Sequence, residues 1–86
     1  MRTTVIISKR GEGYISTVGV PAGRPSGPDG ARAGLTPYDA AVTAARLMLW
    51  YAVNNPDGGV LMAPPEVLEL VPEHLRDVGM AEEPAQ

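Results

Sequence analysis

Few residues in this 86-residue chain carry side chains suited to catalysis or metal binding. Cysteine is absent, and His74 is the single histidine. A metal site or an acid–base pair at His74 would need further imidazole or thiolate ligands, or a positioned nucleophile. Ser8, Ser16 and Ser26 lack the surrounding motif that activates a serine hydroxyl. We therefore expect no catalytic residue, no metal site and no cofactor, and we predict that the protein is not an enzyme.

The carboxylates Glu66, Glu69 and Glu73 recur at three- and four-residue spacing. Because Pro72 interrupts this segment, the spacing favours a solvated face over a catalytic pair. Residues 57–86 carry seven acidic residues and one basic residue, whereas residues 1–46 carry six basic and three acidic residues. The acidic third either keeps the chain in solution or contacts a basic protein partner through these glutamates. The net charge of −3 makes direct nucleic-acid binding unexpected.

Two β-branched stretches at the start of the chain predict an antiparallel hairpin. Residues 3–8 and 14–20 are the strands, and the glycine-rich residues 9–13 connect them. Residues 21–34 contain three prolines and four glycines and are expected to form a flexible loop. A third, edge strand around residues 31–35 is the alternative for the end of this loop.

A long helix is the clearest predicted element. Thr36 is suited to the N-cap, Pro37 to the first helical position and Asp39 to the third. The helix is expected to run to Val53 and to end at residues 54–59, Asn-Asn-Pro-Asp-Gly-Gly. A short strand at 60–62 and helical turns at 66–70 and 73–78 follow.

These elements predict a single α+β domain over residues 1–79, with an acidic, disordered tail at 80–86. In this fold a small antiparallel sheet, formed by the hairpin and the short later strand, packs on the one long helix. No stretch approaches the ~18 apolar residues of a membrane span, and we expect a cytoplasmic protein.

The helix carries more apolar surface than one contact with a sheet can bury. A step of 100° per residue places one apolar stripe toward the sheet; its members are Tyr38, Ala41, Val42, Ala45, Met48, Leu49, Ala52 and Val53. Leu47, Trp50 and Tyr51 then point away from the sheet. Either the C-terminal segment covers these three residues, or they form an interface in a homodimer or with another protein.

The order of the elements, with the residues Gly34-Leu35-Thr36-Pro37-Tyr38-Asp39-Ala40 opening the helix, resembles the HicB-like antitoxin domain. That family typically has Gly-x-Thr-x-x-Glu-Ala at this place. Ala63-Pro64-Pro65 is similar to its proline-containing exit, so the resemblance covers residues 3–65. It implies a partial RNase H-like β-β-β-α-β fold that binds and blocks a small toxin ribonuclease and often dimerises.

The leading functional hypothesis is therefore a protein-binding module that inhibits or sequesters a partner, such as a basic nuclease or a nucleoprotein complex. It would be antitoxin-like, or a phage-encoded inhibitor such as an anti-CRISPR protein. Six Arg against one Lys is typical of high-GC bacterial or phage genes. The residues of this chain predicted to contact the partner are Leu47, Trp50, Tyr51, Glu66, Glu69 and Glu73. The alternative is an assembly subunit that acts by homo-oligomerisation.

Overall fold

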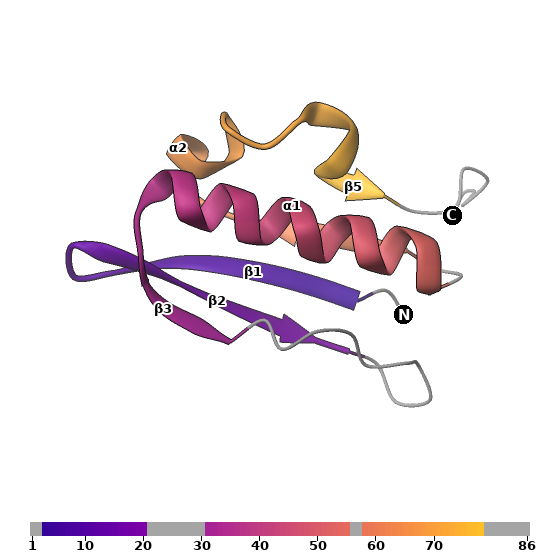
Figure 1. Ribbon diagram of the computed structural model, residues 1–86, viewed down its shortest axis with the longest axis horizontal. Coiled ribbons are helices and arrows are strands. Elements are labelled where there is room, and N and C mark those ends of the chain that lie inside the picture. The colour runs from indigo at the N-terminus through magenta and orange to yellow at the C-terminus, as the bar shows by residue number, and fades with distance from the viewer. Residues whose placement is uncertain (1–2, 21–30, 56–57, 79–86) are drawn as a thin grey trace.

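The computed structural model describes residues 3–20, 31–55 and 58–78, in which one long helix lies across a five-stranded sheet (Figure 1). The elements are β1 (Thr3–Arg10), β2 (Gly13–Gly19), β3 (Arg32–Leu35), α1 (Pro37–Asn54), β4 (Gly59–Met62), α2 (Pro65–Leu68), the 3₁₀ turn η1 (Glu73–Leu75) and β5 (Asp77–Val78). The strand order is β3-β2-β1-β4-β5. The expected α+β class, with a sheet on one main helix, is confirmed.

The N-terminal hairpin is also confirmed, with a first strand two residues longer than expected and a second strand shifted by one residue. Arg10 pairs with Gly13, which leaves Gly11 and Glu12 as a two-residue turn. The φ angle of +62° at Gly11 lies in the left-handed region, where a side chain would be strained.

The loop expected over residues 21–34 ends earlier than its composition suggested. Arg32–Leu35 is the edge strand β3, which pairs antiparallel with β2 through Tyr14 and Ser16. The pairing register shifts between these two β2 residues, which accommodates Ala33 and Gly34 in the strand. Residues 21–30 lie outside the described part of the chain.

The start of α1 follows the local signals in the sequence. The Thr36 hydroxyl oxygen accepts a hydrogen bond of 3.0 Å from the backbone N–H of Asp39, and Pro37 opens the helix. At the other end, the backbone N–H of Asn55 donates to the carbonyl of Tyr51 and closes the last turn. The helix therefore spans one residue more than expected.

The later strand pairs differently from the expected antiparallel arrangement. β4 pairs in parallel with β1, from Thr3 opposite Gly59 to Ile6 opposite Met62, so the sheet is mixed. β2 is antiparallel to both β1 and β3, so β3 runs in the same direction as β1. The helix α1 then carries the chain back to the end of the sheet at which β1 begins. β4 consequently starts at the same end as β1.

The C-terminal segment forms two helical turns, α2 and η1, on either side of Pro72, as expected. The second turn is shorter than predicted because Asp77–Val78 forms β5, antiparallel to β4. The tail predicted at residues 80–86 lies outside the described residues.

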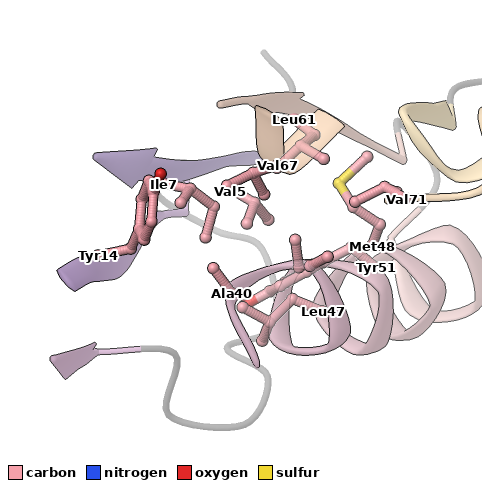
Figure 2. Close-up of a cluster of buried hydrophobic side chains, with 12 residues drawn as sticks. Val5, Ile7, Tyr14, Ala40, Leu47, Met48, Tyr51, Leu61, Val67 and Val71 are labelled. Carbon is pink, nitrogen blue, oxygen red and sulfur yellow. The ribbon is translucent and has the colours of Figure 1, made fainter. Parts of the chain in front are cut away.

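The core lies between the sheet and the helical elements α1, α2 and η1. Figure 2 shows Val5 and Ile7 of β1 and Leu61 of β4 directed toward Leu47 and Met48 of α1. Val67 of α2 and the following Val71 belong to the same cluster, in which Val71 lies beside Met48 (Figure 2). In Figure 1, α2 and η1 lie along the side of α1 that is away from β3.

Candidate functional site

The buried side of α1 is not the stripe that the helical periodicity placed on the sheet. Its buried residues are Ala40, Ala41, Ala44, Leu47, Met48 and Tyr51. Leu47 and Tyr51 are only 3% and 1% exposed, so both belong to the core and neither offers an interface. The predicted orientation of the helix was therefore wrong, because only Ala41 and Met48 of the eight residues placed on the sheet are buried.

Trp50 occupies an intermediate position between the core and the surface. It is half-buried and packs edge-on against Tyr51, with ring centroids 4.9 Å apart. Aromatic pairs favour this T-shaped arrangement. Trp50 thus borders the core rather than standing at the centre of an exposed face.

The other side of α1 exposes apolar side chains along almost its full length. Tyr38, Leu49 and Val53 are 67%, 55% and 77% exposed. Val42 and Ala45, which are partly exposed, fill the same side between them. We call these five residues the outer stripe. A helix that packs on one face normally turns polar residues to water on the other, so the outer stripe marks a candidate interaction surface.

A pocket of about 480 Å³ borders the outer stripe on the side of β3. Arg32 and Leu35 of β3 form one wall, and Asp39, Thr43 and Arg46 of α1 contribute to the other. Within the described residues, no ion pair involves either arginine. The lining of the pocket thus combines two arginines and one aspartate with the apolar residues Leu35, Val42 and Leu47.

The three glutamates expected to contact a partner do not form one surface with Leu47, Trp50 and Tyr51. Glu69 and Glu73 are exposed on the α2–η1 segment. The Glu66 carboxylate accepts a hydrogen bond of 2.6 Å from the buried Tyr14 hydroxyl. Lys9 lies over the Tyr14 ring, with its ammonium 5.0 Å from the ring centroid. Glu66 therefore ties α2 to the hairpin, which gives it a structural role.

This contact changes the titration of both partners. The hydrogen bond from Tyr14 lowers the pKa of Glu66 below its ordinary value, a direction that the charge of Lys9 reinforces and burial opposes. The same bond raises the pKa of Tyr14, and burial and the negative charge of Glu66 act in the same direction.

Replacing Tyr14 by phenylalanine is expected to raise the pKa of Glu66 toward its ordinary value. Because the folded-state pKa of Glu66 is lowered, its contribution to stability is present above the unfolded-state pKa and is lost as pH falls through the folded-state value. The Tyr14 contribution has the opposite sign and is lost as pH rises through its raised pKa. The free energy of unfolding of Tyr14→Phe, measured with urea, should therefore fall less steeply than that of the wild type as the pH is lowered. Carboxyl-carbon NMR titration gives the pKa of Glu66 directly.

The matched control is Tyr38→Phe, which removes an exposed hydroxyl from the outer stripe. An equal shift of the Glu66 pKa in both variants would contradict a specific Tyr14–Glu66 bond.

The described part of the chain contains no cluster of potential metal ligands. Among these residues, no three potential ligands of the His, Cys, Asp or Glu type come together. His74 is exposed on η1. None of the helices in the described residues is long and apolar enough to cross a membrane.

Sequence reasoning missed the outer stripe as an exposed surface, although five of the eight residues placed on the sheet belong to it. The signal was present in the composition of the helix, which is apolar on nearly every side. It also missed the pocket, because Arg32 and Arg46 come from separate elements. No protein-family model matches the chain, and a search of curated proteins finds no match either.

Proposed function

We propose that this protein is a non-enzymatic protein-binding module that sequesters or inhibits a protein partner through the outer stripe. The observation that carries the proposal is the apolar character of the outer side of α1, whose other side already fills the core. Leaving Tyr38, Leu49 and Val53 in water forgoes free energy that burial against a partner would recover.

The fold supports an antitoxin-like form of this function. The order β1-β2-β3-α1-β4 is the β-β-β-α-β order that the resemblance to HicB-like antitoxins implies. In that form the partner is a small toxin ribonuclease. A phage-encoded inhibitor of a host defence complex, such as an anti-CRISPR protein, is the other form. Both act by covering a surface of the partner and need no catalytic group.

The test compares Leu49→Asp with Met62→Asp. Both positions are exposed, at 55% and 57%, and both changes replace an apolar side chain by a carboxylate. Proteins captured by the wild type from cells that express it would be purified and titrated against all three forms. We expect Leu49→Asp to weaken binding about tenfold or more, as for a central interface residue, and Met62→Asp to leave it unchanged.

Equal binding by the wild type and by Leu49→Asp would remove the outer stripe from the function. Circular dichroism and thermal unfolding of each variant establish that the loss of binding does not reflect unfolding.

A second candidate function, self-assembly, is supported by the outer face of the sheet. No described element covers this face, on which Ile6, Ile15 and Val60 are half-buried and Met62 is exposed. Sedimentation over a range of concentrations tests it. A dimer that Met62→Asp dissociates and Leu49→Asp does not would assign the sheet face to self-assembly.

A further inference from the structure

We infer that the outer stripe and the pocket between β3 and α1 form one docking surface for an amphipathic helix of a protein partner, whose apolar side is flanked by carboxylates. This inference rests on the proposed function, because it specifies the chemistry of the partner segment that the outer stripe binds. Three features of the described residues carry it: the continuity of the two surfaces, the shape of the stripe and the sign of its charges.

The outer stripe and the pocket are continuous at Val42. This residue belongs to the stripe and also lines the pocket. Arg46 follows one helical turn later and lines the pocket as well. A segment lying along the stripe therefore passes beside the guanidinium groups of Arg32 and Arg46. Carboxylates on its near side can form charge-assisted hydrogen bonds with them.

The shape of the stripe suits a helix. Tyr38, Val42, Ala45, Leu49 and Val53 follow one another at intervals of three or four residues. These intervals produce a straight, narrow row along a helix of roughly 1.5 Å rise per residue. Ala45, in the middle of the row, leaves space for a larger side chain of a neighbouring helix. An amphipathic helix presents a complementary row.

The net charge of the pocket beside the stripe is positive. Within the pocket, the two positive charges of Arg32 and Arg46 outnumber the one negative charge of Asp39. Both arginine side chains are exposed. A partner with carboxylates beside its apolar row gains favourable electrostatics, whereas lysines at the same places meet like charge.

A second copy of α1 is a poor occupant of this surface. In a parallel two-fold pairing the Arg46 side chains of the two copies lie on opposite sides of the interface, each beside a flank of the other helix that carries no carboxylate of α1. In an antiparallel pairing the two stripes overlap fully when their centres meet, and Arg46 lies next to that centre. The antiparallel arrangement brings like charges together at its centre, and the parallel arrangement places no carboxylate of α1 beside Arg46.

The test uses a displayed library of about 20-residue peptides, long enough to span roughly 30 Å as helices. Their apolar positions are spaced for a helix, and the flanking positions vary among acidic, basic and neutral residues. Peptides selected on the wild type would be titrated against four variants: Leu49→Asp, Arg46→Glu, Arg46→Lys and Arg10→Glu. Arg10 is an exposed cation that does not line the pocket, and it provides the matched control.

We expect selection of peptides with Asp or Glu beside the apolar row. Their affinity should fall about tenfold or more in Leu49→Asp and Arg46→Glu, and remain close to wild type in Arg46→Lys and Arg10→Glu. Raising the salt concentration should weaken the wild type more than Arg46→Glu.

Other outcomes overturn the inference and separate it from the proposed function. Selected helices without an acidic preference, whose binding depends on Leu49, would overturn the charge assignment and leave the protein-binding function intact. Basic peptides that depend on Glu69 and Glu73 would move the site to the α2–η1 segment. Self-association that Leu49→Asp abolishes would make a second copy the occupant. If no selected peptide depends on Leu49, both the inference and the proposed role of the stripe fail.

Discussion

Replacing Leu47 by aspartate is expected to unfold the protein, whereas the same change at Leu49 leaves it folded. Leu47 is 3% exposed and lies within the core cluster, while Leu49 is 55% exposed on the outer stripe. Truncating a buried leucine to alanine costs about 2–5 kcal/mol, and an unpaired buried carboxylate adds a further penalty. A domain of this size has a free energy of unfolding of only about 4–13 kcal/mol.

Circular dichroism and amide NMR dispersion measure the outcome. We expect Leu47→Asp to lose helical signal and dispersion at room temperature, and Leu49→Asp to retain both. A folded Leu47→Asp together with an unfolded Leu49→Asp would show that the helix presents its other side to the sheet. The pair also separates stability from binding, because only Leu49→Asp reports on the outer stripe in a folded protein.

Replacing Thr3 by valine is expected to destabilise the protein by about 1–3 kcal/mol, through the loss of one buried hydrogen-bond acceptor. The side-chain amide of Asn55 donates to the Thr3 hydroxyl over 2.9 Å, and both side chains are almost fully buried. This bond joins the residue after α1 to the first residue of β1. Thr3→Val leaves the Asn55 amide without its acceptor and should lower Tm by about 4–8 °C for each kcal/mol.

A double-mutant cycle with Asn55→Leu isolates the contribution of the bond. Removing both polar partners should cost less than the sum of the single changes, because no buried group is then left unpaired. Among the described residues, no donor bonds to the buried side-chain oxygen of Asn55, so Asn55→Leu also removes one unpaired acceptor. The control is Thr4→Val, half-buried on the opposite side of β1. Additive effects in the cycle would contradict the Thr3–Asn55 bond.

The elements that could be predicted from the sequence are those with local signals. The hairpin follows from two β-branched stretches joined by a short glycine-rich connection. The start of α1 follows from Thr36, whose hydroxyl bonds the Asp39 amide as its position suggested. Pro72 likewise separates two helical turns. These signals act over a few residues, so no distant contact was needed to interpret them.

The orientation of α1 could not be predicted, because apolar residues occupy most of its circumference. Periodicity selects a buried face only when the opposite face is polar. The packing of the C-terminal segment contributes to the choice of buried face, because Val67 and Val71 belong to the core cluster that contains Leu47 and Met48. Such packing depends on where the chain returns after β4. The parallel pairing of β4 and the strand β5 depend on the same return.

Asn55 illustrates a second limit. Its sequence context, beside Asn54 and before a proline, indicated only that the helix ends there. Its buried amide bond to Thr3 is a long-range contact that no local pattern encodes. The candidate site shares this property, because the pocket is created by Arg32 and Arg46 from separate elements.

The position of β1 at the centre of the sheet has a consequence for how the chain acquires its structure. β1 pairs with β2 across a two-residue turn, whereas its other edge pairs with β4, which comes much later in the chain. Thr3 therefore pairs with Gly59, a residue far from it in the sequence. The hairpin closes a short loop, whereas the second pairing closes a long one at a larger entropic cost. The rate-limiting barrier to folding should therefore lie at the docking of β4, after the hairpin and helix have formed. Until then the second edge of β1 is open to other strands, which makes this interval the one most exposed to aggregation during synthesis.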